Sequence, residues 1–335
     1  MINYKKIDAH FTEIEQDLEP EKWLELRKTG IGGSDAGAIM GLNSYSSPLT
    51  VYFQKKGIQG FKGNLATEWG HILEAPIRQK TREELGVEII TVPGMYRSKE
   101  HYFMNANLDG LMDTGDKTLS LGDCEVKGLG GHEIKTSSHG AGFSDDEIPD
   151  SYYCQVQHYM AVTGLQWFIL TVFFLDKKVG KHYIVLRNED FINVLIEKET
   201  NFWENYVMVD KIPEPLGVDS ENEYLQNVQL DEEVICDEET EKLIEEEKEI
   251  ESRIKELDSK KSELKNKIIL KLVENSTGKE GAEKTIAKVG SYKLSYSTQI
   301  KKSVDSAMLK KDGLFDKYSK ESSYKTLRIS ELKNE

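Results

Sequence analysis

An acidic residue and a lysine stand two positions apart at Glu133 and Lys135. Alternate residues of a strand share a face, so both side chains would project together from a strand over His132–Thr136. Asp109 ends another short apolar stretch, and an antiparallel neighbouring strand would bring it to Glu133. Mg²⁺ prefers carboxylate, water and phosphate oxygens as ligands, and a nearby lysine can orient or deprotonate an attacking water. The pattern therefore predicts metal-dependent hydrolysis of a phosphodiester.

The same triplet occurs a second time at Glu125 and Lys127. The two triplets flank the glycine-rich segment Gly128–Gly131, so we expect them to form the arms of one hairpin. An acid and a lysine at this spacing are common by chance in charged chains, where they mark a solvated strand face. We prefer Glu133 as the metal-binding acid and keep Glu125 as the alternative.

Polar side chains on two predicted helices belong to the same hypothesis. Glu74 lies on a long helix, either simply exposed or turned inward as a further acid beside the metal. Gln155 and Tyr159 are four residues apart and share a helix face, with Gln157 between them as a supporting residue. The competing interpretation of this segment is an amphipathic core helix.

A glycine-rich run, Arg27–Asp35, leads into a further predicted helix. The backbone N–H groups at Gly33, the Ser34 hydroxyl and the Arg27 guanidinium would suit a phosphate. The run lacks the Lys-Ser/Thr pair that follows the glycines in a nucleotide-binding P-loop. The alternative is a plain capped turn, with Ser34 or Asp35 as the helix cap.

The elements that would position these residues alternate between helices and strands. Hydrophobic periodicity and turn residues predict helices over 48–56, 65–85, 150–163 and 189–209. Runs of β-forming residues predict strands over 88–92, 102–108, 132–136, 167–175 and 181–186. This order predicts a mixed α/β fold, and we expect a nuclease-like core over residues 1–212.

Two further parts follow this core. An acidic linker and a long charged helix are expected over 213–275, and a basic extension over 276–335 with a hairpin at Thr285–Ser297, a short helix and a last strand at Tyr324–Ile329. Apolar residues recur every seven positions in the long helix, at Leu243, Ile250, Leu257 and Leu264. A second series, four residues further along, contains Ile254 and Ile268 but is interrupted by Glu247 and Lys261. Because this heptad pattern is imperfect, a solvated helix competes with an intermolecular coiled coil.

The net charge of -15 does not exclude a polyanionic substrate, because its distribution is uneven. Glu214–Glu251 holds 16 acidic and 2 basic residues, whereas Ser252–Glu335 holds 20 basic and 12 acidic residues. Local potential rather than net charge decides binding. The sequence has no apolar run of membrane-spanning length, and its three cysteines are scattered. The first twenty residues have no apolar core, so we expect no secretory leader. We therefore expect a cytoplasmic protein with reduced thiols and no membrane partner.

The order of these segments resembles the YqaJ-like viral recombinase family, phage-type exonucleases similar to lambda exonuclease within the PD-(D/E)xK superfamily. The resemblance covers about residues 20–210 and rests on five segments: Leu26-Arg27 with Ile31–Asp35, Trp69-Gly70 with Glu74, Asn107–Gly110, Glu133–Thr136, and Pro149 with Tyr153, Gln155, Gln157 and Gly164.

The resemblance implies a restriction-endonuclease-like core with a central mixed sheet flanked by helices. It implies that Asp109, Glu133 and the Ile134 carbonyl hold Mg²⁺, which Mn²⁺ would replace, and that Lys135 activates water. Glu74 and Gln155 would be further active-site residues and Tyr159 a structural companion, while Arg27 and Ser34 would hold a 5′ phosphate. Four cysteines, which an iron–sulfur cluster needs in related nucleases, are lacking, so we expect no such cluster.

The implied activity is 5′→3′ digestion of one strand of linear duplex DNA, leaving a 3′ overhang for a single-strand annealing protein of the RecT type. A phage or prophage origin and a ring-shaped homo-oligomer are also implied. Two alternatives stay open: an endonuclease of restriction or junction-resolving type on the same core, and a non-enzymatic acidic helical interaction protein.

Overall fold

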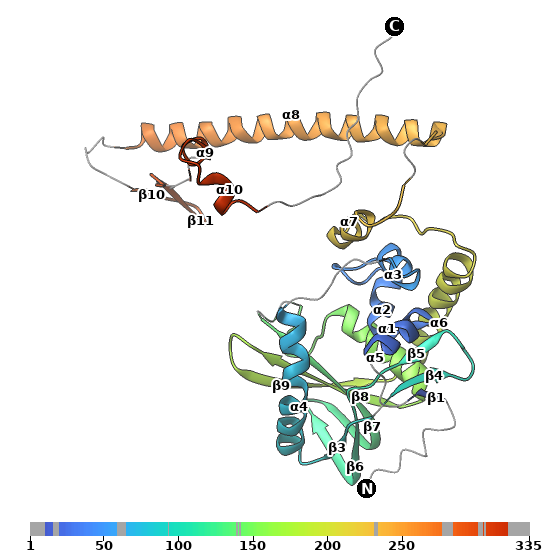
Figure 1. Ribbon diagram of the computed structural model, residues 1–335. Helices are drawn as coiled ribbons and strands as arrows, with labels where there is room; N and C mark the ends of the chain where they lie inside the picture. The colour runs from blue at the N-terminus through green and yellow to red at the C-terminus, as the bar shows by residue number, and fades with distance from the viewer. Residues whose placement is uncertain are drawn as a thin grey trace. The chain divides into compact units, whose positions relative to one another are not determined.

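A computed structural model gives the fold of this protein (Figure 1) and describes residues 11–15, 20–58, 65–92, 94–138, 140, 142–230, 234–276, 284–300, 304 and 306–320. The chain divides into two compact units, Met1–Gln229 and Leu230–Glu335. The predicted three-part division at residues 212 and 275 stays a prediction.

A five-stranded sheet lies at the centre of the first unit, with the strand order β3-β6-β7-β8-β9 (Figure 1). Its strands are β3 (Glu88–Ile90), β6 (Gly110–Leu121), β7 (Cys124–Ser137), β8 (Trp167–Phe174) and β9 (Val179–Leu186). The β7–β8 pair is parallel, and the other three pairs are antiparallel. The sheet is therefore mixed, and the predicted α/β class is confirmed.

A second, smaller sheet carries Ile31–Gly32, the middle of the glycine-rich run. It has the order β1-β4-β5-β2, formed by β1 (Phe11–Glu15), β4 (Met95–Ser98), β5 (Met104–Ala106) and β2 (Ile31–Gly32). The two-residue β2 pairs in parallel with β5 and leads directly into a helix. The predicted strand 102–108 contains β5, whereas the other three strands were not predicted, because two to five residues carry little periodicity.

Helices of the first unit begin and end at residues with clear local preferences. They are α1 (Pro20–Lys28), α2 (Gly33–Ile39), α3 (Pro48–Lys55), α4 (Leu65–Leu85), α5 (Asp150–Thr163), α6 (Glu189–Phe202) and α7 (Asp219–Leu225). Ser47 accepts a hydrogen bond from Thr50 N–H and caps α3, with Pro48 at its first position. Gly164 ends α5 with φ +71°, a left-handed conformation that glycine adopts without strain. The predicted bounds of α4 and α5 are confirmed.

The core forms where β8 and α5 meet. Phe168, Leu170 and Val172 of β8 are fully buried, as expected for a strand with neighbours on both edges and covered faces. Helix α5 buries Val156 and Met160 in the same cluster and packs against α2, where a Cβ on Gly37 would lie 2.9 Å from Ser151 Cα. This close packing fixes the rotation of α5 above the sheet.

The predicted hairpin around Gly128–Gly131 is wrong, because both triplets lie on the single strand β7. The turn between β6 and β7 falls instead between Leu121 and Cys124. Gly130 and Gly131 serve packing: an added Cβ would lie 2.3 Å from the Trp167 ring and 2.2 Å from the Phe168 ring, respectively. Because these two positions carry no side chains, the Trp167 and Phe168 rings can pack directly against the backbone of β7.

Three smaller predictions need correction. Helix α2 is capped by Gly32, not by Ser34 or Asp35, and the Asp35 carboxylate accepts the Gly32 N–H from the third helical position. Asp109 does not end a strand, since β5 stops at Ala106 and β6 starts at Gly110. The helix after Asn188 changes to a π-helical turn at Trp203–Val207. The predicted strand Tyr324–Ile329 lies outside the described residues.

The second unit contains the long helix α8 (Glu238–Glu274), capped by Asp237, which accepts the Thr240 N–H. The β10 (Lys284–Val289) and β11 (Tyr292–Ser297) strands form the predicted hairpin, and α9 (Ser306–Lys311) and α10 (Phe315–Tyr318) follow. Helix α8 buries none of its residues. Across the described residues of the chain, we find no helix long and apolar enough to cross a membrane.

Candidate active site

Asp109 and Glu133 meet where β6 begins beside β7. Gly110 pairs with His132 in the β6–β7 ladder, so Asp109 lies next to the backbone that carries Glu133. Its carboxylate Oδ2 accepts the Ile134 N–H at 2.8 Å. Arg78 of α4 supports this turn from the other side, donating from Nε to the Asp109 carbonyl at 3.1 Å. The structure therefore places Asp109 beside Glu133 as expected, but just before the start of β6 and not at the end of the preceding strand.

The Ile134 carbonyl faces the same side as Asp109. In a strand, the N–H and C=O groups of one residue point to the same edge, and the Ile134 N–H points to Asp109. The β6 ladder ends at Gly110 opposite His132, so no residue of β6 lies opposite Ile134. Its carbonyl oxygen is thus directed toward the space beside the two carboxylates.

The Glu133 carboxyl group is buried and has a raised pKa. Its side chain is buried, and its Oε1 accepts hydrogen bonds from Lys135 Nζ at 2.7 Å and from Gln155 Nε2 at 2.6 Å. Its Oε2 is buried without a hydrogen-bond partner. Burial and the neighbouring Asp109 charge raise the pKa of Glu133 to about 8. A buried oxygen that lacks a partner is costly, and a cation would supply one.

Lys135 provides the positive charge of this cluster. Its ammonium group lies 2.7 Å from Glu133 Oε1 and 5.1 Å from the centre of the Tyr152 ring. Burial disfavours the charge, but Glu133 and Asp109 outweigh burial and raise the pKa of Lys135. Lys135 is therefore protonated in this environment, where it can donate hydrogen bonds to an oxygen.

The donor set fits Mg²⁺ better than a fully protein-ligated metal. Among the described residues, no three His, Cys, Asp or Glu side chains converge closely enough to hold an ion by themselves. Mg²⁺ commonly takes one or two carboxylates and fills its other positions with water and phosphate oxygens. Asp109, Glu133 with its free Oε2 and the Ile134 carbonyl match that pattern.

Glu74 lies at the rim of the cluster. Its side chain is about one-third exposed and lies 3.1 Å from His71 Nδ1. Its charge contributes, as the smallest of several causes, to the raised pKa of Glu133, so α4 brings this carboxylate near Glu133 while leaving it partly exposed. Glu74 makes no hydrogen bond to Asp109 or Glu133 among the contacts of the described residues.

A chain of contacts joins the carboxylates to the glycine-rich run. Gln155 Nε2 donates to both Glu133 and the Tyr159 hydroxyl, the latter at 2.9 Å. The Tyr159 ring packs on Gly33, where an added Cβ would lie 2.4 Å from Tyr159 Cε1. Ser34, the next residue, is exposed. The two parts of the predicted site are therefore neighbours in space.

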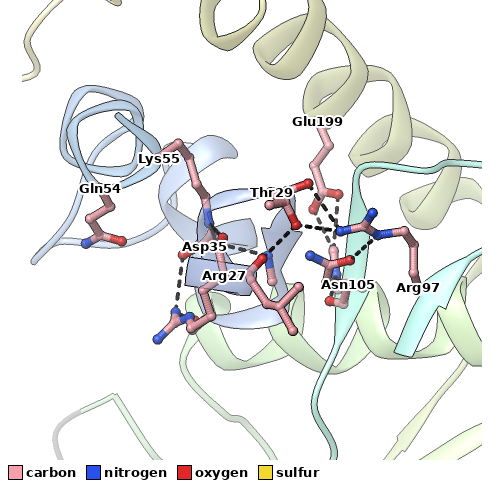
Figure 2. Close-up of polar contacts among 12 residues, drawn as sticks. Arg27, Thr29, Asp35, Gln54, Lys55, Arg97, Asn105 and Glu199 are labelled. Carbon is pink, nitrogen blue, oxygen red and sulfur yellow. Dashed lines mark hydrogen bonds and ion pairs between the residues drawn. The ribbon is translucent and has the colours of Figure 1, made fainter. Parts of the chain in front are cut away.

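The glycine-rich run is supported by a buried ion pair. Figure 2 shows Asp35 between Lys55 and Arg27; Lys55 Nζ lies 2.6 Å from Asp35 Oδ2 and also donates to the Arg27 carbonyl at 2.9 Å. Arg27 donates to the Ser34 hydroxyl at 2.8 Å. Burial alone would raise the pKa of Asp35, but Lys55 and Arg27 outweigh it and hold that pKa below its usual value. Arg27 and Ser34 thereby present a guanidinium and a hydroxyl together.

Two predicted candidates lie outside this cluster. Gln157 is buried and bonds to the backbone of Leu186 and Asn188, so it holds α5 to the end of β9. Glu125 pairs across the hairpin with Ser120 and is exposed. Since Asp109 adjoins the opposite end of β6, Glu125 cannot share a metal with it.

Several supporting residues were missed from the sequence. Lys55 gives no signal except its place in the last turn of α3. His158 is fully buried; its Nδ1 lies 2.8 Å from Glu199 Oε1 and its Nε2 lies 2.8 Å from the Asn105 carbonyl. Both nitrogens face acceptors, which favours the imidazolium, and the Glu199 charge outweighs burial to raise the pKa of His158. This pair ties α5, and with it Gln155, to α6 and β5.

Comparisons with known proteins agree with the sequence resemblance. Residues 22–166 match the model of the YqaJ-like viral recombinase domain. A Bacillus subtilis (strain 168) protein named YqaJ is 25% identical over 327 residues, which cover 94% of this chain and 96% of that relative.

Solved structures with a similar chain include an alkaline exonuclease (LHK-Exo) from Laribacter hongkongensis, with 19% identity and a TM-score of 0.42, covering 57% of this chain and 94% of that one. A phage related exonuclease from Haemophilus somnus 129PT is 13% identical with a TM-score of 0.38, covering 57% of this chain and 100% of that chain.

Proposed function

Because the chain carries a YqaJ-like viral recombinase domain over residues 22–166, we propose that this protein is a Mg²⁺-dependent exonuclease acting on linear double-stranded DNA. The observation that carries the proposal is the convergence of Asp109 and Glu133 at Ile134, with Lys135 bound to Glu133 and one Glu133 oxygen buried without a partner. Mn²⁺ would replace Mg²⁺ in the same donor set.

Each side chain has a distinct task in this proposal. Mg²⁺, when bound, neutralises the phosphate and makes a water molecule more acidic. Asp109, Glu133 and the Ile134 carbonyl would hold the ion. The Lys135 ammonium would orient the attacking water or stabilise charge on the phosphate. Gln155 holds the Glu133 carboxylate in place through a 2.6 Å hydrogen bond.

We infer the polarity of digestion from Arg27 and Ser34, which the contacts of Gln155 and Tyr159 link to the carboxylates. Arg27 and Ser34 would bind a terminal 5′ phosphate, since a guanidinium and a hydroxyl together form charge-assisted hydrogen bonds to phosphate oxygens. An enzyme that cuts internally has no use for a pocket that recognises a strand end. We therefore favour 5′→3′ digestion of one strand, leaving a 3′ overhang, over an endonuclease.

The wider setting is part of the same proposal. A 3′ overhang is the substrate of a single-strand annealing protein of the RecT type, which we propose as the partner. We place the reaction in the cytoplasm of a bacterial host, in a phage or prophage context, and propose a ring-shaped homo-oligomer of the first unit around the duplex. The matched recombinase domain supports this setting.

A nuclease assay on three substrates tests the activity. Linear duplexes with 5′-phosphate ends should be degraded with Mg²⁺ and spared with EDTA, and 5′-hydroxyl ends should be degraded more slowly. Covalently closed circular duplex should stay intact. Cutting of the circle would favour the endonuclease, and a protein inert with both Mg²⁺ and Mn²⁺ would favour a non-enzymatic role.

The chain offers a matched control for the metal-binding acid. Glu133→Gln and Glu125→Gln change the same residue type in the two acid-x-lysine triplets of one strand. We expect Glu133→Gln to lower activity by more than about a hundredfold, because metal ligation is lost, and Glu125→Gln to be neutral. Equal activity of folded Glu133→Gln and wild type would refute the assignment, and near-UV circular dichroism would verify folding.

A further inference from the structure

Helix α8 exposes an apolar seam along its length. Leu243, Ile250, Leu257 and Leu264 recur every seven residues and are between 52% and 61% exposed. Ile254 and Ile268 stand four residues after Ile250 and Leu264 and are 52% and 48% exposed. This spacing is that of the seam of a coiled coil. Water-exposed aliphatic residues in such a row indicate a surface that another helix covers.

The polar residues of this seam argue against a parallel partner of the same sequence. Glu247 and Lys261 occupy the positions between the apolar residues, seven before Ile254 and seven after it. In a parallel, in-register pair, each seam residue meets its own copy. Glu247 would then face Glu247, and Lys261 would face Lys261, and both like-charge contacts are destabilising.

The charge of α8 is divided between its two halves. Residues 238–251 hold eight acidic and two basic residues, whereas residues 252–274 hold seven basic and four acidic residues. A second α8 running in the opposite direction sets the acidic half of each helix against the basic half of the other. A parallel copy would bring two acidic halves together, and the repulsion would oppose pairing.

We propose that α8 forms an antiparallel coiled coil with the α8 of a second copy of this chain. The inference concerns the second unit and stands whether or not the first unit is a nuclease. The alignment that sets Glu247 of one copy against Lys271 of the other also pairs four of the six apolar seam residues with one another. Its remaining layers are Ile250 with Ile268, Ile254 with Leu264, and Leu257 with Lys261.

This alignment leaves each polar seam residue with a suitable neighbour. Glu247 and Lys271 form an ion pair near each end of the coil. Lys261 lays its aliphatic stem over Leu257 and keeps its ammonium group in water. Glu251 meets Lys265 on the flank of the same alignment.

The mass of the full chain in solution tests the pairing. Ile254→Lys puts a charge in the seam, whereas Ser259→Lys places the same side chain on the outer face of α8, where Ser259 is exposed. By light scattering after size exclusion, we expect Ile254→Lys to have half the mass of the wild type and Ser259→Lys to keep it. A wild type that contains an odd number of chains, or the same mass for Ile254→Lys and wild type, would overturn the proposal. Helix content by circular dichroism verifies that α8 persists.

Charge exchange tests the orientation. Glu247→Lys and Lys271→Glu should each raise the dissociation constant of the pair at least about tenfold, because each places like charges together, and the double variant should restore it. In a parallel pair the double variant brings no rescue, so failure of rescue would refute the antiparallel alignment.

Cysteine cross-linking gives an independent readout of direction. Cys236 is exposed and lies just before α8. In a parallel pair the two Cys236 thiols would meet, whereas in the antiparallel pair a helix of roughly 55 Å separates them. In a Cys124→Ser background, a short bismaleimide should therefore give no dimer through Cys236, and efficient cross-linking would contradict the proposal.

Discussion

Replacing Lys55 by methionine should strongly destabilise the first unit. Lys55 and Asp35 form an ion pair 2.6 Å apart, with side chains only 3% and 4% exposed. Lys55→Met keeps the length and apolar stem of the side chain but leaves the Asp35 carboxylate without its nearest cation. The substitution therefore leaves the Asp35 carboxylate charged and unpaired with Lys55 in a site that is almost inaccessible to water.

The magnitude follows from what still surrounds Asp35. Removing one partner of a buried ion pair costs about 3–5 kcal/mol, because the other charge stays buried and uncompensated. Arg27 remains 3.7 Å from Asp35 Oδ1, and the Gly32 N–H still donates to Oδ2 at 2.9 Å. These contacts compensate part of the loss, so we expect the lower end, about 3 kcal/mol.

The measurement is urea denaturation followed by intrinsic fluorescence at neutral pH. Lys56→Met serves as the control, because Lys56 is adjacent in the chain and pairs with the largely exposed Asp210. A surface pair contributes about 0–1 kcal/mol. The double variant Asp35→Asn/Lys55→Met should regain most of the lost stability, since neither charge is then buried alone. Equal effects of Lys55→Met and Lys56→Met, or a double variant as unstable as the sum of its single variants, would refute this reasoning.

The remaining predictions concern pH and three glycines. Folding lowers the pKa of Asp35 below its ordinary value of 3.8. The ionised carboxylate therefore contributes its full stabilisation above pH 3.8, and this contribution is lost as the pH falls through the folded-state pKa. Asp35→Asn should remove this acid-dependent part of the stability in denaturation curves measured from pH 2 to 6. Gly131→Ala would set a Cβ 2.2 Å from the Phe168 ring and should cost about 1–3 kcal/mol or more, while Gly180→Ala, with open space around it, should stay within about 0.5 kcal/mol of the wild type. Gly33→Ala would push the Tyr159 ring at 2.4 Å and should lower nuclease turnover at saturating Mg²⁺ by at least about tenfold; unchanged turnover would show that the contact chain from Gly33 to Glu133 has no part in catalysis.

Strand and helix periodicity predicted the parts of the site that share one element or adjoin in sequence. Glu133 and Lys135 project together because alternate residues of a strand share a face, and Gln155 and Tyr159 because residues four apart share a helix face. The turn residues Pro48, Gly86 and Gly164 predicted where helices begin or end. In each case the information is local, so a single sequence suffices.

Contacts between distant segments could not be predicted in this way. The pairing of Lys55 with Asp35 and of His158 with Glu199 depends on how α2, α3, α5 and α6 pack, and no spacing in the sequence encodes it. The glycines at 130 and 131 look like a turn locally, but Trp167 and Phe168 on β8 require them within a strand. The choice between Glu125 and Glu133 likewise needed the register of β6 against β7.

Metal binding measured by calorimetry tests the central claim most directly. Mn²⁺ or Mg²⁺ should bind wild-type protein and Glu125→Gln with the same affinity. Asp109→Asn and Glu133→Gln should each bind the ion at least about tenfold more weakly, with unfolding midpoints near that of the wild type. Wild-type affinity in folded Glu133→Gln, or no binding of either ion to the wild-type protein with DNA present, would contradict a metal site at Asp109 and Glu133.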